Sequence, residues 1–567
     1  APINPGPAAD SGHDQKDTIM NLRAMLRENG LWALLWLLLL AASLYARPPI
    51  PIDETRYLSV AWEMWRSGNF LVPHINGVPY SHKPPLLFWL IHLGWWLFGV
   101  NEWTARVTPP LFGLGAILLA RSLAVRLWPD DPAVRRLVPL FLLGSFFWAL
   151  FSTLTMFDML VAFFSLAALH GLLLAHQGRP VAGWALFALA LALGVLAKGP
   201  VILVYVAGPA LLAPLWQERK GAAWLGWYGG FLAAVAVACG LALAWAIPAA
   251  IAGGEEYGQT LLVGQTAGRM VRSFAHQRAF WWYLAFLPLL MLPWTLCGCL
   301  WRGLGRVTLS RSLAVRFCLT ALVPAFLFLS LVSGKQVHYL LPLLPVFYLA
   351  AARGFGLVTE ERRPGILPVT FFFLLPAAVI PVLSLLPLQG GDAWPLTRLP
   401  AWFGLGPLFA ALVLWTMRHA GTITLVRTIA TVSVLVLVFL QLSLRTSLHR
   451  LYEPGDIFAA MHQAQEHGFD IAVYPPRLAD QFQFAARLSR PLIRQPILPK
   501  ELVWSYHHQE GGYCLLFVED EKDLWLLEHE GVKTRYNNGW LIFRPARGLY
   551  DEYLVMERKR KEQGRTR

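Results

Sequence analysis

Charge is scarce in this chain. Only 14% of its 567 residues are Asp, Glu, Lys or Arg, whereas 56% are hydrophobic. Soluble domains carry about 25% charged residues, and several apolar runs here are long enough to cross a bilayer, which takes roughly 20 residues. The shortage of charge excludes an ordinary soluble enzyme. The sequence predicts a polytopic α-helical membrane protein.

Cysteine and acidic residues are also few. Of the five cysteines, Cys239, Cys297, Cys299 and Cys318 lie in or beside apolar runs and Cys514 stands alone in a polar region. This distribution is typical of small core residues and excludes a disulfide framework. The net charge of +14 is expected from basic cytoplasmic loops and contacts with anionic lipid. We therefore predict membrane lipids as partners and no nucleic acid.

The first 16 residues are not expected to be a secretory signal, because no apolar segment with a small-residue cleavage site follows closely. Residues 1–17 are predicted to be a disordered leader, and the first apolar run is predicted to remain as an anchor.

Fourteen apolar segments follow, and one is too short to span. Residues 86–99 (LLFWLIHLGWWLFG) would form a helix about 21 Å long, against a hydrocarbon core of about 30 Å. The segment contains His92 and five aromatic residues, a composition typical of a helix lying in the membrane interface.

The placement of basic residues tests this interpretation. If the N-terminus is cytoplasmic and 86–99 does not span, every cytoplasmic turn is basic, as the positive-inside rule requires. The pattern predicts thirteen spans within residues 18–444. It also predicts a first outer loop, 47–106, with interfacial helices at 53–66 and 86–99.

The polar tail, 445–567, would then lie outside with this loop. DIAVYP and YCLLFVE read as buried strands, and DIFAAMHQAQEH and EDEKDLWLLEHE read as amphipathic helices. The tail is predicted to be a small soluble α/β domain.

Three acidic residues on the outer side are candidates for chemistry. Asp53 and Glu54 open a predicted helix, where acids also stabilise the helix dipole, so a structural role stays open for them. Asp158 lies between two apolar stretches at the outer surface, where an acid is costly unless it is paired or functional. We expect Asp53 and Asp158 to face one cavity, one as a base and the other as a metal ligand or orienting group.

Basic residues on the same side favour an anionic ligand. Lys83 precedes Pro84-Pro85, which fix the direction of the chain, and is either a snorkelling lysine or a phosphate ligand. A second outer loop carries Arg269, Arg272 and Arg278, against the topological bias. Lys198 and Lys335 are either anchors at span ends or members of the same group.

Histidines and tyrosines of the outer side leave two questions open. His82, His276 and His338 have no close metal-binding spacing, although a site assembled from separate loops is conceivable. Tyr57, Tyr80 and Tyr339 are either members of an aromatic belt or donors to a polar head group. The spans lack the midplane acids and broken helices of transporters, so the chemistry is expected at one surface.

The combination resembles the GT-C membrane glycosyltransferases of the protein O-mannosyltransferase superfamily. DETRYLSVAWEMWRSGNFLVPHINGVPYSHKPPLLFW, TMFDMLVAF, LAKGP, HQRAFWWY and SGKQVHYLLP, spread over about residues 30–350, are similar to segments of the lipid A 4-amino-4-deoxy-L-arabinose transferases. The resemblance implies an undecaprenyl-phosphate-linked sugar donor and a lipid A phosphate acceptor. It also implies transfer at the periplasmic face of a Gram-negative inner membrane, which protects against polymyxin and other cationic antimicrobial peptides.

The resemblance also implies roles for individual residues. Asp53 and Asp158 match the catalytic acids of the family, with Glu54 beside the first, and Lys83 matches the residue on the donor phosphate, where Arg269 and Arg272 are expected to assist. Further substrate contacts are expected from Arg56, Tyr57, Tyr80, Lys198 and Tyr339. Some relatives have Glu where this chain has His82, so a divalent metal (Zn, or Mg or Mn) at His82 and His276 stays an open possibility, with no other cofactor. A monomer is expected.

Three other functions remain as alternatives. The same fold could serve a protein or another glycan acceptor, the chain could be a transporter of a sugar-lipid, or it could be a non-catalytic assembly protein.

Overall fold

The computed structural model of the chain describes most of its length. The described residues are 11–262, 264, 277–358, 365–385, 399–495, 504–505, 507–508, 511–519, 527 and 530–565.

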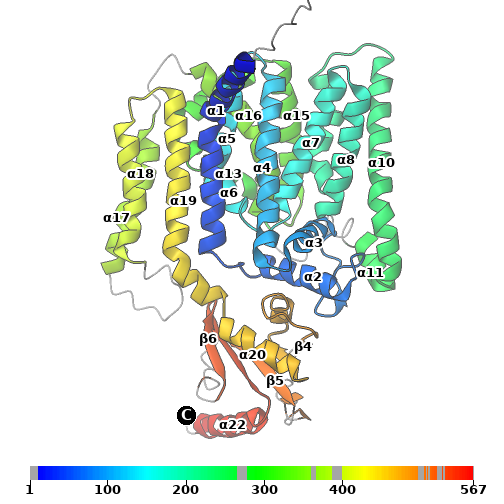
Figure 1. Cartoon of the computed structure of the whole chain (residues 1–567), viewed down its shortest axis with the longest axis vertical. Helices are drawn as coiled ribbons and strands as arrows, with labels where there is room; N and C mark the ends of the chain where they lie inside the picture. Colours follow the sequence, from blue (N-terminus) through cyan, green and yellow to red (C-terminus); the bar gives the residue numbers. More distant parts are fainter. Residues whose placement is uncertain are drawn as a thin grey trace, which may run out of the picture.

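Most of the chain forms a bundle of long apolar helices (Figure 1). Among the described residues, nine helical segments are long and apolar enough to cross a membrane. These segments comprise α1 (Ser11–Ala46), α4 (Glu102–Leu127), α7 (Asp158–His176), α8 (Pro180–Lys198), α10 (Ala223–Ala252), α15 (Leu313–Leu331), η4 (Val337–Leu343) continuing into α16 (Leu344–Val358), α17 (Leu367–Leu385) and α19 (Thr422–Tyr452).

Shorter helices lie in or overlap the other predicted spans, except Glu255–Gln259, which lies in the predicted second outer loop. They are α5 (Pro132–Gly144), α6 (Phe146–Phe151), α9 (Ile202–Leu211), η1 (Ala213–Leu215), α11 (Glu255–Gln259), α13 (Trp282–Leu290), η3 (Trp294–Leu296), α14 (Gly298–Leu309), η6 (Ala401–Gly404) and α18 (Leu405–Thr416). The predicted span 137–151 is divided at Ser145, and the predicted span 280–300 is divided between α13, η3 and α14. The polytopic architecture is confirmed, while the count of thirteen spans stays a prediction.

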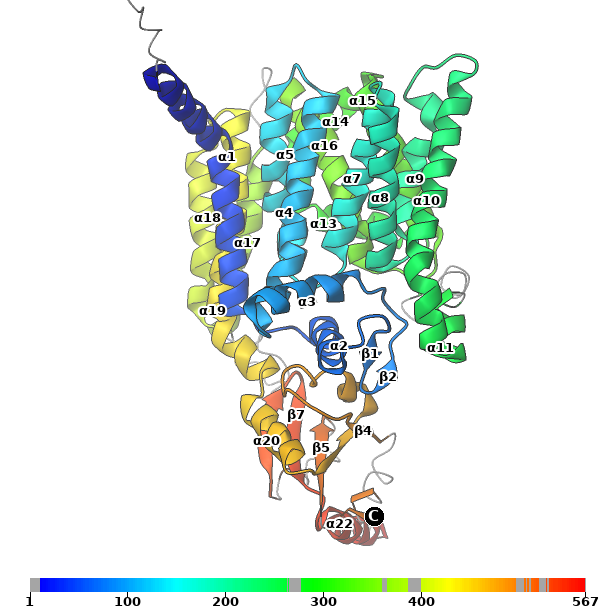
Figure 2. The same cartoon turned by 45° about the vertical axis from the view of Figure 1, so that its right-hand side comes forward.

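Two helices lie across the end of the bundle. α2 (Asp53–Ser67) and α3 (Leu86–Phe98) have the bounds predicted for the interfacial helices to within a residue. Figure 2 shows both at the end of the bundle that carries the C-terminal domain. The first loop and the tail therefore share one side, as the charge pattern predicts.

A close helix pair sets the position of one candidate acid. α7 and α8 are antiparallel neighbours, and a Cβ added to Gly171 would stand 2.6 Å from the Gly183 oxygen. Small residues let membrane helices approach this closely. Because Asp158 begins α7 and Lys198 ends α8, the pairing brings the two charges to the same end of the bundle.

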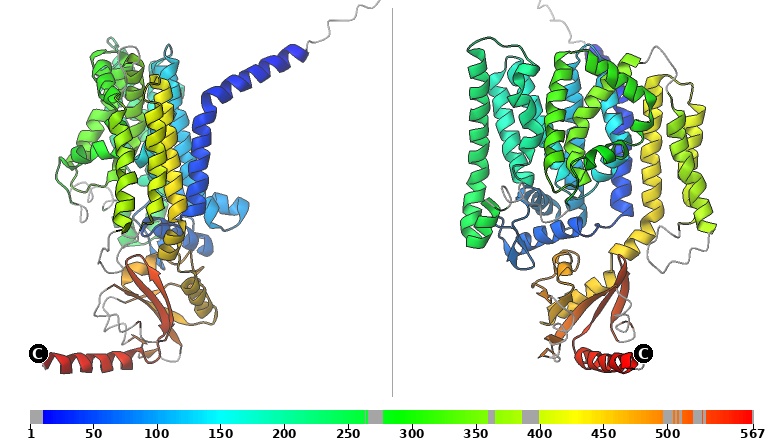
Figure 3. Two further views of the ribbon diagram at one scale, coloured as in Figure 1. Left: turned by 90° about the vertical axis from the view of Figure 1, so that its left-hand side faces the viewer. Right: turned by 180° about the vertical axis from the view of Figure 1, so that it is seen from behind.

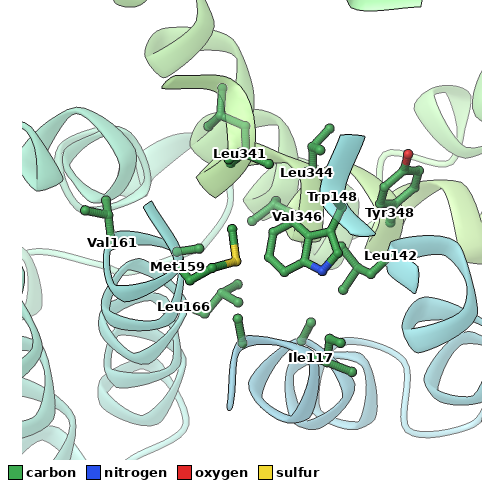
Figure 4. Packing of buried hydrophobic residues seen from close by; sticks show 14 of the residues in the cluster. Ile117, Leu142, Trp148, Met159, Val161, Leu166, Leu341, Leu344, Val346 and Tyr348 are labelled. Carbon is green, nitrogen blue, oxygen red and sulfur yellow. The ribbon is translucent and has the colours of Figure 1, made fainter. Parts of the chain in front are cut away.

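The apolar core continues through the bundle. Figure 4 shows Ile117, Trp148, Met159, Leu166 and Leu344, from α4, α6, α7 and α16, packed against one another. All five are buried. The ends of α7 and η4 are thus held by tight packing, which suits them to position side chains.

The C-terminal domain is built on a five-stranded mixed sheet. Its strand order is β4-β3-β5-β7-β6, with β3 parallel to β4 and β5 and antiparallel pairing elsewhere. Its elements are α20 (Gly455–Glu466), β3 (Asp470–Tyr474), η7 (Pro476–Asp480), β4 (Ile493–Arg494), β5 (Gly512–Val518), β6 (Val532–Tyr536), β7 (Gly539–Pro545) and α22 (Leu549–Arg565). The two predicted strands and the helix predicted at DIFAAMHQAQEH are confirmed. Most of the helix predicted at 519–530 lies outside the described residues.

Two predicted boundaries differ from the structure. α1 begins at Ser11, so residues 11–17 of the predicted leader are helical, and residues 1–10 lie outside the described part. α19 continues to Tyr452, past the predicted end of the membrane domain at 444. In both places a polar sequence without a proline extends an apolar helix, and hydropathy marks where polarity changes, not where a helix ends. Figure 3 shows the domain beyond α19, with α22 at its far side.

Candidate active site

Asp53 begins α2 and keeps part of its surface open. Its Oδ1 accepts from Arg56 Nη2 at 2.5 Å and from the Tyr57 hydroxyl at 3.2 Å. The Asp53 side chain is 44% exposed. Burial raises the pKa of Tyr57 well above its usual value, and Asp53 and Tyr80 raise it further. The Tyr57 hydroxyl therefore stays protonated and orients a carboxylate that a ligand can still reach.

Glu54, the neighbouring acid, points into the protein. Its carboxylate accepts from Arg47, from the Ile50 N–H at 2.9 Å and from the Thr155 N–H at 2.6 Å. Burial by itself raises the pKa of Glu54, but the charges of Arg47 and Arg106 and the backbone donors outweigh it and lower the pKa below its usual value. The structure thus gives Glu54 a position suited to holding segments together, and the catalytic role predicted for it stays a prediction.

Asp158 lies in a sealed ion pair. Lys198 Nζ donates to Asp158 Oδ1 at 2.6 Å, and the two side chains are 12% and 3% exposed. Lys198 also lies 5.0 Å from the centroid of the Tyr339 ring. Three predicted site residues on α7, α8 and η4 therefore meet at one point.

Lys83 lies near Phe157, the residue before Asp158. The Lys83 Nζ is 5.7 Å from the centroid of the Phe157 ring, against which Tyr57 also packs edge-on at 4.9 Å. Lys83 is close enough to Asp158 to act on it electrostatically. Asp53, Lys83 and Asp158 are thus gathered around a single aromatic ring.

Tyr80 and His82 form the wall next to Lys83. Their rings stack with centroids 5.3 Å apart, and Tyr80 is 5% exposed. The Tyr80 N–H donates to the Pro73 oxygen at 2.7 Å, which fixes the chain just before Lys83.

Two residues of this site were not in the predicted set. His338 is within electrostatic reach of Asp158, Lys198, Lys83 and Asp53, and Phe157 is the ring around which the charges gather. His338 stood in SGKQVHYLLP as a candidate metal ligand without close partners. Phe157 carried no signal, because an aromatic residue before a span is common.

The C-terminal end of the second outer loop, at Arg278, is hydrogen-bonded to the segment before η4. The Arg278 N–H donates to the Ser333 oxygen at 3.1 Å, and Lys335 Nζ donates to the Arg278 oxygen at 3.1 Å. Lys335 is thus a buried anchor for the loop end. Arg269, Arg272 and His276 lie outside the described residues.

The metal prediction stays untested. Within the part of the chain that the structure describes, no group of three or more His, Cys, Asp or Glu side chains could hold a metal ion. His276, the predicted partner of His82, falls outside that part.

Comparison with known proteins agrees with this architecture. Residues 82–245 match the family model described as dolichyl-phosphate-mannose-protein mannosyltransferase. The chain is 30% identical over 345 residues to the undecaprenyl phosphate-alpha-4-amino-4-deoxy-L-arabinose arabinosyl transferase of Erwinia tasmaniensis, an alignment that covers 59% of this chain and 61% of the relative. The protein of that name in Pseudomonas aeruginosa is 33% identical over 317 residues, covering 55% of this chain and 56% of the relative. The matches thus span about three-fifths of these relatives.

Solved structures extend the likeness over nearly the whole chain. The crystal structure of ArnT from Cupriavidus metallidurans in the apo state aligns with a TM-score of 0.73 at 19% identity, over 92% of this chain and 98% of that one. The same protein bound to undecaprenyl phosphate aligns with a TM-score of 0.74, also at 19% identity, over 92% and 99%. The chain has the GT-C fold of membrane glycosyltransferases. Within that class, its resemblance to the aminoarabinose transferases is confirmed.

Proposed function

We propose that the chain transfers 4-amino-4-deoxy-L-arabinose from undecaprenyl phosphate to a phosphate group of lipid A. The transfer takes place at the periplasmic face of the inner membrane and lowers the negative charge that attracts polymyxin-like peptides. The observation that carries the proposal is the gathering of Asp53, Lys83 and the Asp158–Lys198 pair around Phe157 at one end of the bundle. The names of the relatives supply the sugar and the donor lipid.

The charges define the roles in this reaction. An oxygen of the lipid A phosphate attacks the anomeric carbon, and the bond from that carbon to the donor phosphate oxygen breaks. The leaving undecaprenyl phosphate gains negative charge, which Lys83 stabilises. The attacking phosphate is already anionic near neutral pH, so no strong base is required.

Asp53 orients the substrates in this scheme. Its open carboxylate is available to the ammonium of the sugar, while Arg56 and Tyr57 hold it in place. Asp158 assists by holding the Lys198 ammonium beside Tyr339. A serine or threonine acceptor would instead require Asp53 to remove a proton as a general base.

The test combines purified protein, lipid-linked aminoarabinose and lipid A in vesicles, with mass spectrometry of the lipid A. Wild type is expected to add the mass of one or two aminoarabinose units, and Asp53→Asn is expected to add none while unfolding at an unchanged temperature. Asp551→Asn, an exposed site in α22, serves as the control. Sugar found on a protein or another glycan would support the alternative acceptor, and an active Asp53→Asn variant would refute the role of Asp53.

A further inference from the structure

A short hairpin in the first loop delivers the Lys83 segment. β1 (His74–Ile75) and β2 (Val78–Pro79) pair antiparallel across Asn76 and Gly77, whose φ angles are 51° and 78°. Asn-Gly is the sequence that such a two-residue turn favours, because both positions require positive φ. Tyr80, His82 and Lys83 follow directly after the second strand, so the position of the hairpin sets theirs.

The carboxamide of Asn76 is hydrogen-bonded to residues of the C-terminal domain. Nδ2 donates to the Leu492 oxygen at 2.8 Å, while Oδ1 accepts from the Leu492 N–H at 2.7 Å and from Gln483 Nε2 at 2.9 Å. Asn76 and Gln483 are 5% and 1% exposed. Both the nitrogen and the oxygen of the buried Asn76 carboxamide are hydrogen-bonded, whereas Gln483 Oε1 has no partner among the described residues. The Asn76 carboxamide therefore favours a single geometry, because its displacement leaves further polar groups unpaired.

The other side of the turn is fixed to α2. The N–H groups of Asn76 and Gly77 both donate to the carboxylate of Glu63, the second at 3.0 Å. A Cβ on Gly77 would stand 2.7 Å from Pro491 Cγ. The turn is therefore held on one side by α2 and on the other by the domain, and Figure 2 shows the hairpin beside α2, between the bundle and the domain.

The same segment of the domain packs against both interfacial helices. Trp62 Nε1, on α2, donates to the Leu488 oxygen at 2.9 Å. Phe484 stacks on Trp95 of α3 with centroids 5.4 Å apart and planes within 3°, and the Arg487 guanidinium lies 3.9 Å above the Phe484 ring. Residues 483–492 thus form a junction in which Gln483, Phe484, Leu488 and Leu492 are buried.

We propose that the C-terminal domain serves as a clamp on the hairpin, with Asn76 and Gln483 as positioning residues that hold Lys83 toward Phe157 and Asp158. The identity of the ligand at Lys83 rests on the proposed function. Because the clamp already orders the loop that carries Lys83, less conformational entropy is lost when the ligand binds. The clamp is therefore expected to increase the affinity for the donor. Once the donor is bound, the reacting groups are the same with or without the clamp.

The test uses the full chain in lipid nanodiscs with Asn76→Ala and, from the domain side, Gln483→Ala. Hydrogen exchange of residues 74–83 is expected to accelerate in both, and undecaprenyl phosphate is expected to bind about tenfold more weakly in Asn76→Ala, which leaves buried groups unpaired. The KM for the donor should rise while kcat at saturating donor changes little. The control is Asn538→Ala, because the Asn538 amide donates a hydrogen bond to Glu519 in another turn of the domain. Gln483→Ala keeps the test available if Asn76→Ala does not fold.

A double-variant experiment separates positioning from general destabilisation. If Asn76 acts through Lys83, adding Asn76→Ala to Lys83→Ala should weaken undecaprenyl phosphate binding no further. Unchanged exchange in both single variants, or additive losses, would overturn the clamp. Hydrogen exchange and undecaprenyl phosphate affinity can both be measured without sugar transfer. A wild-type protein that fails to transfer aminoarabinose but shows these changes would therefore refute the proposed function and leave the clamp standing.

Discussion

Asp53 and Asp158 carry the same functional group in two opposite environments. Asp53 is half open and shared between Arg56 and Tyr57, whereas Asp158 is sealed against Lys198. An open carboxylate can exchange one partner for a substrate. A buried carboxylate cannot leave its partner without a large loss of free energy. The two acids are therefore suited to binding and to organisation of the site, respectively.

Lys83→Ala is expected to weaken binding of the donor by tenfold or more, because a hydrogen bond to a charged group contributes about 1.5–3 kcal/mol. Titration with undecaprenyl phosphate measures the effect. Lys220→Ala, which removes an exposed lysine beyond α9, is the control. An unchanged affinity would move the phosphate site to the arginines of residues 269–278.

Asp158→Asn is expected to destabilise the protein by about 3–5 kcal/mol, because it leaves Lys198 buried without its anionic partner. The double variant Asp158→Asn with Lys198→Met should regain much of this stability and remain inactive. Thermal unfolding and the lipid A assay measure the two effects. A double variant as unstable as Asp158→Asn would show that the pair does not explain the loss.

For individual residues, the sequence indicated which side chains were candidates for the site, but it did not indicate which of them are in contact. Asp53, Lys83 and Asp158 could be selected because polar residues in an apolar chain are conspicuous. The bond between Asp158 and Lys198 joins residues 40 positions apart, and hydropathy carries no information on which span ends meet. Glu54 shows the same limit, since adjacent acids at a helix start look alike until the helix shows which one faces inward.

At the level of helices and strands, the position of the N-terminal end of α2 depends on the buried carboxylate of Glu54. Glu54 joins the end of α1, through Arg47, to Thr155 in the turn before α7. Arg106 of α4 closes the network by donating to the Ser43 and Arg47 oxygens at 2.9 and 2.5 Å. The helices that carry Asp53 and Asp158 are thereby tied to each other.

Glu54→Gln is expected to lower stability by about 3 kcal/mol, because Arg47 loses its buried counter-charge. It should also lower kcat more than it raises the KM for the donor, since it disturbs the relation of Asp53 to Asp158 and not Lys83. Steady-state kinetics and thermal unfolding check both. A rise in KM alone would contradict this assignment.

The pH dependence of unfolding supplies a control on the same variant. The folded pKa of Glu54 lies below the usual 4.5, so its contribution to stability is present above pH 4.5 and is lost as the pH falls through the folded pKa. Wild type should therefore lose more stability than Glu54→Gln on acidification below pH 4.5.

Long helices and strands could be predicted, and short elements could not. The strands at 470–474 and 512–518 could be predicted because residues 471–474 and 513–518 are uninterrupted apolar runs. The β1–β2 hairpin has strands of two residues, too short for an alternating pattern, although Asn76-Gly77 was a usable signal. The division of 137–151 at Ser145 could not be predicted from hydropathy, although Gly144-Ser145 is a pair at which helices often kink.

For the whole molecule, the topology gives a direct prediction. In a variant lacking Cys239, a cysteine at Ser67 should react with a membrane-impermeant maleimide in intact spheroplasts, because the proposed topology places α2 on the periplasmic side. A cysteine at Lys220 should react only after the membrane is opened. The reverse pattern would place the site on the cytoplasmic side.

The junction around Asn76 also limits how such proteins can be recombined. Its hydrogen bonds join residues about 416 positions apart, so the hairpin and the segment 483–492 behave as one unit split between two regions of the chain. A chimera that takes its tail, from the end of α19 onward, from another protein would pair the β1–β2 hairpin of one protein with the 483–492 segment of the other. Exchange of residues 74–79 together with the tail is the smallest transplant that keeps the unit whole.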